Sequence, residues 1–278
     1  MNLDRFIEQS NLPANFAESA KHCYLPFADW LEGRLAETHS DTYVLGINGA
    51  QGTGKSTLAQ LLSDYLASKY GRKVVILSID DIYLTRAERE SLGETVHPLL
   101  KTRGVPGTHD VDLGLSVIEK LRTLEQGETT AVPRFDKSRD DRCPSSEWST
   151  VTGPVDLVIF EGWCVASQAT TDADLQEPIN ALESMDDADA RWRIYVNDQL
   201  GTDYVPLFEA LDEQLKAYFE GSLKKFDLPL ELAGTKFQKQ VWHELLSIPY
   251  GESRTNQEQA TGIGKPKAVR AVARANGD

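Results

Sequence analysis

The chain has 278 residues, of which 40% are hydrophobic and 26% charged, as in a globular protein with one large domain or two ordinary ones. Its apolar runs are too short for a membrane span, and its N-terminus lacks the basic region and apolar run of a signal peptide. Its three cysteines are scattered and form no CxxC pair, which argues against a disulfide or zinc framework. We therefore expect a cytoplasmic protein. The net charge of −14 argues against nucleic acid as the ligand of most of the chain.

The first 38 residues have a helical pattern. Pro13 and Pro26 interrupt this pattern, and proline breaks a helix interior, so we expect two short helices rather than one long helix. No residue type in this segment indicates chemistry, and we expect it to serve packing. Its expected apolar face consists of Phe16, Cys23, Tyr24, Phe27, Trp30 and Leu31.

A glycine-rich loop follows the first predicted strand, residues 43–47. Residues 49–56 read GAQGTGKS, which fits the phosphate-binding pattern GxxxxGK[ST] without a mismatch. Glycines let backbone N–H groups approach phosphate oxygens, Lys55 can reach the β- and γ-phosphates, and the Ser56 hydroxyl can bind Mg²⁺. A helix with Leu58, Leu61 and Leu62 on one face follows, and anions bind well at helix N-termini. The alternative is a glycine-rich turn with a chance lysine. We predict a nucleoside triphosphate site formed by Gly49, Gly52, Thr53, Gly54, Lys55, Ser56 and Thr57.

A second predicted strand, residues 73–79, ends in Asp80 and Asp81. Ligands of open parallel sheets bind at the carboxyl ends of the strands, so these carboxylates should face the same crevice as Lys55. One of them could accept a proton from an attacking hydroxyl or hold Mg²⁺ through water. The alternative is a pair of solvated loop acids.

Two loops with charged residues follow. Residues 97–110 combine Gly and Pro turn signals with Arg103, His109 and Asp110, which is typical of a binding loop. Apolar residues between Leu113 and Leu121 then indicate a helix that ends near Gly127. Beyond this helix, residues 134–142 contain four cations. This run is either a solvated charged loop or, in a phosphotransferase, a lid that brings positive charge over the transferring group.

A third predicted strand, residues 155–160, is followed by Glu161. A carboxylate at this position usually helps to hold Mg²⁺ in proteins with a phosphate-binding loop, and the alternative is a structural acid at the strand end. Two helices are expected next, over residues 188–201 and 204–219.

The tail differs in charge from the rest of the chain. From Leu215 onward, 10 Lys and Arg residues face 7 Asp and Glu, a net charge of +3, so the preceding part carries −17. Such an asymmetry indicates two units with different partners. A helix with Phe237, Val241, Leu245 and Leu246 on one face, a Pro-Tyr-Gly turn, a short helix and the basic segment 265–274 predict either DNA binding or a helical appendage that packs on a surface.

The motifs before the tail resemble those of bacterial and plant glycerate kinases, which are P-loop kinases related to uridine and pantothenate kinases. The resemblance runs from the N-terminal helices to about Leu211, keeps the motif order and fades near Leu215. It implies ATP-dependent phosphorylation of glycerate or a similar small hydroxy acid, with Mg²⁺. The shared strings are GINGAQG (46–52), LSIDDIYLT (77–85), HPLL (97–100), RGVPGTHD (103–110), PRFDK (133–137), FEGWC (160–164), PINALE (178–183) and WRIYVN (192–197).

The resemblance also implies roles for single residues. Asp80 stands where the related kinases place their general base, and Lys55 neutralises phosphate charge. The implied catalytic residues are Lys55, Asp80 and Lys137, the metal-side residues are Ser56 and Glu161, and the candidate substrate and lid contacts are Asp81, Arg103, His109 and Arg134.

The tail resembles methylated-DNA–protein-cysteine methyltransferases. In that family this stretch is a helix-turn-helix with a recognition helix, and Arg270 matches the intercalating arginine. The tail departs from the family at Asn256, which stands where the family uses a tyrosine to turn out the damaged nucleotide. The Pro-Cys-His-Arg motif with the acceptor cysteine would fall beyond Asp278. The shared strings are FDLPL (226–230), GT (234–235), FQKQVW (237–242), IPYGE (248–252) and KPKAVRAV (265–272), and the implied DNA contacts are Lys267, Arg270 and Arg274.

We therefore expect an α/β domain with a mostly parallel sheet over residues 1–214, joined to a small helical segment of the helix-turn-helix type over residues 215–278. The expected function is phosphoryl transfer from ATP to a small hydroxy acid. The alternative is a DNA-binding module without methyl-transfer activity, in which the tail binds duplex DNA weakly. No membrane partner is expected.

Overall fold

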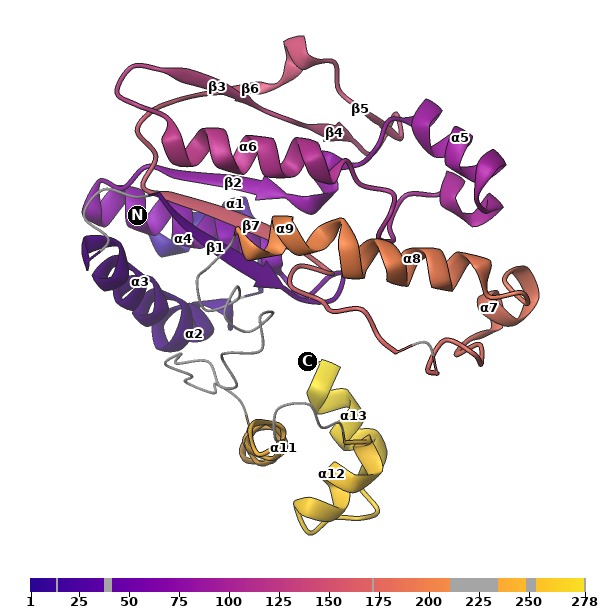
Figure 1. Ribbon diagram of the computed structural model, residues 1–278. Helices are drawn as coiled ribbons and strands as arrows, with labels where there is room; N and C mark the ends of the chain where they lie inside the picture. The colour runs from indigo at the N-terminus through magenta and orange to yellow at the C-terminus, as the bar shows by residue number, and fades with distance from the viewer. Residues whose placement is uncertain (14, 38–41, 172, 211–234, 249–253, 278) are drawn as a thin grey trace.

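A parallel three-stranded sheet organises the larger part of the molecule. The computed structural model describes residues 1–13, 15–37, 42–171, 173–210, 235–248 and 254–277 (Figure 1). The sheet consists of β1 (Tyr43–Asn48), β2 (Val74–Ser78) and β7 (Leu157–Gly162) in the order β1-β7-β2. In the register, Asn48 pairs with Gly162 and Ser78 pairs with Glu161, so the carboxyl ends of the three strands meet at one edge.

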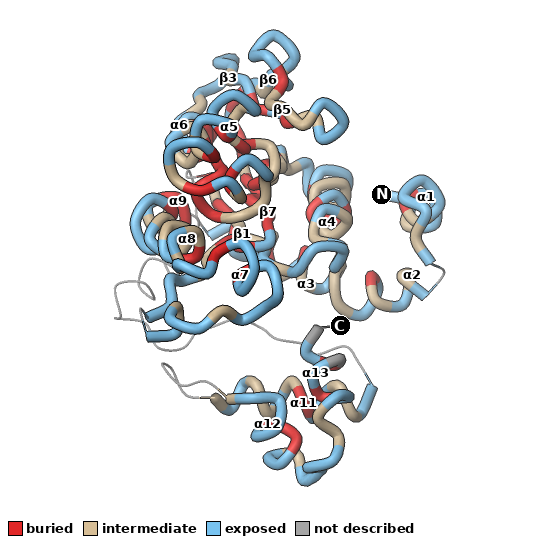
Figure 2. The backbone as a smooth tube through the Cα atoms, turned by 90° about the vertical axis from the view of Figure 1, so that its right-hand side faces the viewer, coloured by how far each residue is buried: buried red, intermediate tan, exposed pale blue. Residues whose placement is uncertain are grey.

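Helices cover both faces of this sheet, because the side chains on both faces of its central strand β7 are buried. Every residue of β7 is buried, as expected for a central parallel strand. Leu157 and Ile159 pack with α3 (Leu25–Glu37) and α4 (Lys55–Tyr70). Val158 and Phe160 belong to the core that includes α6 (Val111–Thr123) and α9 (Tyr204–Glu209). The buried residues in Figure 2 gather around β7, which makes a helix–sheet–helix sandwich and confirms the expected α/β class.

The N-terminal helices differ from the prediction at one of the two prolines. The chain forms α1 (Leu3–Gln9), α2 (Phe16–Ser19), a π-helical turn (Ala20–Tyr24) and then α3. The break near Pro13 is present, but the helical path is continuous through Pro26. The π turn, in which the Leu25 N–H bonds to the carbonyl oxygen of Ala20, leads into α3 and places Pro26 in its first turn, where a missing N–H is tolerated.

The segment between β2 and β7 is more ordered than the predicted loops suggest. After a 3₁₀ turn (Ile79–Ile82) come α5 (Arg86–Thr95) and a second 3₁₀ turn (Pro98–Lys101), which belongs to the predicted binding loop. Helix α6 ends at Thr123 rather than near Gly127. Two antiparallel pairs follow: β3 (Thr129–Val132) with β6 (Ser149–Thr152), and β4 (Phe135–Asp136) with β5 (Asp141–Arg142). A short 3₁₀ turn (Ser145–Glu147) lies between β5 and β6.

The predicted charged loop therefore contains a tight hairpin. The Asp136 carboxylate accepts hydrogen bonds from the backbone N–H of Ser138 and Arg139, at 2.8 and 3.3 Å, and thereby fixes the turn. Asp140 takes a left-handed conformation with φ 53°, which Asp tolerates better than most residues. Residues 134–142 are thus not a free solvated loop.

The last helices of the larger part include one that was not predicted, α7 (Ala181–Asp186). Helix α8 (Arg191–Thr202) lies close to the predicted range 188–201, and α9 begins at Tyr204 as predicted and ends at Glu209. Residues 211–219 of the longer predicted second helix lie outside the described residues. Among the residues that the structure describes, none of the helices combines the length and the apolar composition that a bilayer crossing requires.

The C-terminal residues form a separate small core. It is built by α11 (Lys236–Leu246), α12 (Asn256–Gly262) and α13 (Val269–Gly277), and its buried residues are Val241, Ala260, Val272 and Ala275. The helical arrangement follows the prediction, and the Pro-Tyr-Gly turn lies outside the described residues. Leu246 was expected on the apolar face but is 57% exposed, because it lies five residues from the buried Val241 and so points away from it.

Gly162 closes β7 where space is restricted, and this predicts a stability difference between two glycine variants. A Cβ at Gly162 would lie 2.4 Å from Cγ2 of Ile79, whereas a Cβ at Gly33 in α3 would meet nothing within 4 Å. We expect Gly162→Ala to destabilise the fold by about 1–3 kcal/mol through overpacking. Gly33→Ala should stabilise it by about 0.5–1 kcal/mol, because alanine favours the helix interior. Chemical denaturation measures both, and equal effects would contradict the packing described here.

Candidate active site

The loop after β1 has the geometry of a phosphate cradle. Gly52 and Gly54 take left-handed conformations with φ 80° and 89°, which residues with a Cβ rarely adopt. A Cβ at Gly49 would lie 2.8 Å from Oγ1 of Thr53. The Thr53 hydroxyl and the Lys55 ammonium group both donate to the carbonyl oxygen of Ala50, at 2.8 and 3.0 Å. The loop thus leads into the N-terminus of α4 with the Lys55 ammonium group held at the loop.

An oxygen pair suited to Mg²⁺ lies beside the cradle. The Ser56 hydroxyl, in the first turn of α4, donates to Oε1 of Glu161 at 2.8 Å. Glu161 is only 5% exposed and belongs to β7, where it pairs in register with Ile47 and Ser78. Carboxylate and hydroxyl oxygens are hard ligands of the kind that Mg²⁺ prefers. The residues therefore fit the ion.

Asp80 faces a lysine from the β4–β5 hairpin. It follows β2, and its Oδ2 lies 2.6 Å from Nζ of Lys137. Partial burial acts to raise the pKa of Asp80, but the hydrogen bond and positive charge of Lys137 outweigh it and hold the pKa below its usual value. Asp80 is therefore an ionised acceptor at neutral pH.

Asp81 is directed elsewhere. Its Oδ1 accepts a hydrogen bond from the backbone N–H of Phe135 at 3.2 Å, which ties the end of β2 to the hairpin. Burial raises the pKa of Asp81, although backbone hydrogen bonds from Phe135 and Ser78 partly offset this effect. The two neighbouring carboxylates thus lie in different surroundings, which sequence alone left open.

One cavity of about 710 Å³ brings most of the predicted charged residues together. Asp81, His109 and Arg134 do not line it, and neither do four cradle residues, Gly49, Thr53, Gly54 and Thr57. Its walls come from the cradle, the strand ends, the loop after the second 3₁₀ turn and the hairpin. The lining residues are Ala50, Gln51, Gly52, Lys55, Ser56, Ser78, Asp80, Tyr83, Thr102, Arg103, Gly104, Lys137, Glu161, Gly162 and Trp163.

His109 and Arg134 lie away from the predicted substrate position. His109 is 5% exposed, its ring stacks on Tyr83 with centroids 4.3 Å apart, and its Nδ1 lies 2.5 Å from the Tyr204 hydroxyl. Burial lowers its pKa to about 3, so the ring is neutral at neutral pH and offers no charge to an acid. Arg134 is exposed and lies just before β4. In the stacked pair of His109 and Tyr83, the residue that lines the cavity is Tyr83, so His109 is not placed to contact a substrate there directly.

Two aromatic residues of the cavity were missed by the sequence reasoning. Tyr83 lines it and follows the Asp-Asp pair, and Trp163 lines it and follows Glu161. The indole Nε1 of Trp163 donates to the carbonyl oxygen of Gly104 at 2.7 Å and so fixes the binding loop against the end of β7. Their closeness in sequence to the acidic residues was the available signal.

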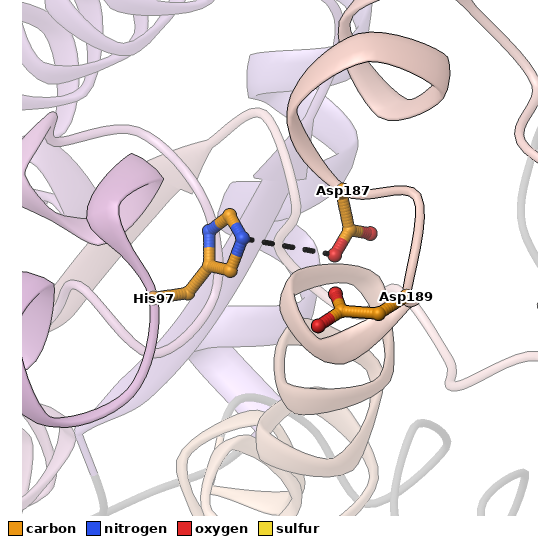
Figure 3. Close-up of side chains that lie close together, drawn as sticks. All are labelled: His97, Asp187 and Asp189. Atoms are coloured by element: carbon orange, nitrogen blue, oxygen red, sulfur yellow. Dashed lines mark ion pairs between the residues drawn. The ribbon is translucent and has the colours of Figure 1, made fainter.

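A second cluster, His97, Asp187 and Asp189, has the residue types of a metal site (Figure 3). His97 Nε2 lies 3.9 Å from Asp187 Oδ1. Both carboxylates already have cationic partners, because Arg193 lies 3.1 Å from Asp187 and Arg191 lies 2.7 Å from Asp189. The cluster is best described as an ion-pair group that ties the binding loop to the start of α8.

The predicted DNA contacts lie on the C-terminal helices. Lys267 precedes α13 and Arg270 lies on it, and both are exposed. Arg274 also belongs to α13. Asn256, which replaces the tyrosine of the resembled family, accepts a hydrogen bond from Nδ2 of Asn276 at 2.8 Å.

The cradle after β1, the carboxylate in β7 and the parallel sheet with helices on both faces together define the P-loop kinase fold. Residues 44–176 match the family model described as "Phosphoribulokinase / Uridine kinase family", so this part of the chain is similar to that family.

Similar proteins include D-glycerate 3-kinases. The chloroplastic D-glycerate 3-kinase of Arabidopsis thaliana is 30% identical over 81% of this chain and 47% of its own length. The structure of a D-glycerate 3-kinase from Cryptococcus neoformans superimposes with a TM-score of 0.56 at 25% identity, over 92% of this chain and 86% of that one. The chain thus spans about half the length of the Arabidopsis protein.

The C-terminal residues have different relatives. Residues 236–278 match the family model described as "6-O-methylguanine DNA methyltransferase, DNA binding domain". The methylated-DNA–protein-cysteine methyltransferase of Methanosarcina barkeri is 56% identical over 69 residues, which are 25% of this chain and 44% of that protein. The expected resemblance of the chain to two families is confirmed.

The Asp80–Lys137 pair predicts a pH-dependent stability difference. We expect Lys137→Met to raise the pKa of Asp80, because burial then acts without a compensating charge. In the wild type the depressed pKa contributes stability above the unfolded value of about 3.9, and this contribution is lost as the pH falls through the folded-state value. The difference in melting temperature between wild type and variant should be largest near neutral pH. It should narrow as the pH falls through the raised pKa of Asp80 in the variant, and narrow further below about pH 4 as the wild-type contribution is lost. A difference that does not change with pH would contradict the pairing.

Proposed function

We propose that the larger part of the chain, residues 1–214, transfers the γ-phosphoryl group of ATP to a hydroxyl group of a small hydroxy acid, with glycerate as the acceptor. The observation that carries the proposal is the cavity in which the Lys55 cradle, the Ser56–Glu161 pair and the Asp80–Lys137 pair share one space. The similarity to D-glycerate 3-kinases supports this choice of acceptor. Residues 215–278 are proposed as a separate unit.

Each charged or polar residue of the cavity has a separate role in the proposed reaction. The glycine loop and Lys55 would hold the phosphates, and Asp80 would accept the proton of the acceptor hydroxyl as its oxygen attacks. Ser56 and Glu161 would hold Mg²⁺, which supplies positive charge to the phosphate oxygens when bound. Lys137 would leave Asp80 for the transferring group, since an ammonium group neutralises charge on phosphate oxygens. Most of the rate enhancement then comes from positioning and electrostatics.

An acid fits the cavity better than a neutral acceptor. Arg103 and Lys137 both line it, and a guanidinium group binds a carboxylate through two parallel hydrogen bonds. The roles of Asp81, His109 and Arg134 as substrate or lid residues stay predictions. Any such role would be indirect: Asp81 would act through Phe135, His109 through Tyr83, and Arg134 through the hairpin that it precedes.

An ATP-consumption screen tests the proposed acceptor. ADP formation should depend on glycerate and be weaker with other hydroxy acids, nucleosides or pantothenate. Turnover that responds to a nucleoside and not to glycerate would overturn the proposal while leaving the kinase fold in place.

Lys55→Ala should abolish this turnover and leave the fold intact. The substitution removes charge from the phosphate site and nothing from the core, because the exposed ammonium group donates to the loop carbonyl oxygen of Ala50. The measurement is ADP release together with a melting curve. Turnover within about tenfold of wild type would remove Lys55 from the mechanism.

Asp80→Asn should slow phosphoryl transfer by about a hundredfold or more, because it keeps the shape of the side chain and removes the proton acceptor. ATP affinity should change far less. Asp81→Asn is the matched control, since Asp81 bonds to the backbone of Phe135 outside the cavity. If Asp81→Asn has the larger effect on the rate, the base has been assigned to the wrong residue.

A second candidate function, DNA binding, is favoured for the C-terminal unit by its family match and by the exposed Lys267 and Arg270. We do not expect the C-terminal unit to transfer a methyl group, because this reaction needs a thiolate nucleophile. Residues 215–278 contain no cysteine. Cys164 is buried, and burial raises its pKa to about 12.

The expected binding to duplex DNA is weak and depends on salt. Contacts to about four phosphates by Lys265, Lys267, Arg270 and Arg274 would give a slope of about −4 in log K against log salt. Fluorescence anisotropy with labelled duplex measures this slope, and Arg270→Ala should weaken binding. Incubation of this chain with duplex that carries radiolabelled methylguanine should leave the protein unlabelled, and label on any cysteine would refute the claim.

A further inference from the structure

Asp140, near the tip of the β4–β5 hairpin, is held closely by two arginines from other elements, and a third, Arg86 of α5, lies 3.9 Å from its carboxylate. Arg89 comes from α5, and Arg103 comes from the binding loop. No role follows from the sequence context of Asp140, which is one of three acids in the charged run 134–142. Its left-handed backbone, with φ 53°, turns the carboxylate toward both guanidinium groups.

Arg89 explains why this carboxylate is needed. Its side chain is 0% exposed, and it donates to the carbonyl oxygens of Leu84, Lys101 and Asp140, at 3.3, 3.0 and 2.6 Å. A buried guanidinium group needs a nearby anion as well as hydrogen bonds, and the Asp140 carboxylate lies 3.2 Å from its Nη2. Arg89 and Asp140 therefore lock the hairpin to α5 and to the start of the binding loop.

The same carboxylate holds a cation of the cavity. Nη1 of Arg103 donates to Oδ1 of Asp140, and the Arg103 guanidinium carbon lies 5.4 Å from the centre of the Phe135 ring. Arg103 lines the cavity whereas Asp140 does not. The guanidinium group of this cavity residue is thus held by a carboxylate and an aromatic ring.

The hairpin also carries Lys137, three residues before Asp140, and Lys137 reaches Asp80 at 2.6 Å. Nearby contacts fix other parts of the hairpin. Arg86 Nη2 donates to the carbonyl oxygen of Arg139 at 2.9 Å, and Arg142 Nη1 donates to Asp110 at 2.6 Å. Among these contacts, Asp140 is the residue that binds Arg103 of the cavity wall.

We propose that Asp140 is a positioning residue that presets Arg103 for an anionic acceptor. The inference rests on the proposed function and specifies how the acceptor site is built. A preset guanidinium group loses little freedom when a carboxylate binds, so Asp140 acts on acid binding and far less on ATP binding, which the cradle after β1 governs.

Steady-state kinetics of Asp140→Asn test this role. The amide keeps the size of the side chain and removes its charge, so we expect the KM for glycerate to rise about tenfold, as for the loss of one charge-assisted hydrogen bond, with the KM for ATP within about twofold. Glu147→Gln is the matched control, because it removes a carboxylate from the 3₁₀ turn that follows the hairpin, where Glu147 forms an exposed pair with Arg139. Equal increases in both KM values would mean a general structural role and overturn the proposal.

Asp140→Glu covers the case in which the neutral variant does not fold. It keeps the charge beside the buried Arg89 but moves it by one methylene group, so the protein should fold while the glycerate KM still rises. An unchanged glycerate KM in a folded Asp140→Glu protein would count against positioning by Asp140.

A chemical readout separates this inference from the proposed acceptor. Arg103 should react with phenylglyoxal at least severalfold faster in Asp140→Asn, or in Asp140→Glu if the first variant does not fold, than in the wild type, measured by peptide mass spectrometry. Arg191 is the internal standard, because it pairs with Asp189 and not with the hairpin. If wild-type protein does not use glycerate, the proposed function fails, and the labelling still decides the role of Asp140. Equal Arg103 labelling in wild type and variant would overturn that role whatever the activity.

Discussion

The strand order β1-β7-β2 is the constraint on which the rest of the site depends. Because all three strands are parallel and in register, the residues that follow them come together although they are far apart in sequence. The cradle follows β1, Asp80 follows β2, and Glu161 stands in β7 between them. The completely buried β7 fixes this arrangement, since its alternating side chains pack into the cores on both faces of the sheet.

Two cations that border the cavity are paired with carboxylates. Lys137 pairs with Asp80, and Arg103 pairs with Asp140. Lys55 donates instead to the carbonyl oxygen of Ala50, and Glu161 accepts from the Ser56 hydroxyl. Paired charges lower the cost of partial burial and hold each group in one position before a ligand arrives. Phosphate and carboxylate groups would then compete for cations that are already oriented. The hairpin and the binding loop matter for the same reason, because they bring these cations to an otherwise acidic strand edge.

Sequence patterns predicted the sheet edge better than they predicted the segments around it. The cradle, the acids at the strand ends and the α/β class follow from local motifs and from one topological rule. The π turn at Pro26, the hairpin over residues 135–142 and the burial of His109 depend on contacts between distant segments, which periodicity does not encode. Helix α5 was missed although Thr85 and Glu88 form a capping box. Asp80 and Asp81 looked alike in sequence and differ in the structure, because Phe135 bonds to only one of them.

The most direct test of the account is ³¹P NMR of the protein incubated with ATP, Mg²⁺ and glycerate. A new phosphomonoester signal should grow at the rate at which the ADP signals appear, because the acceptor hydroxyl in the cavity takes up the γ-phosphoryl group. Growth of ADP and inorganic phosphate alone, or an unchanged ATP spectrum, would contradict this prediction.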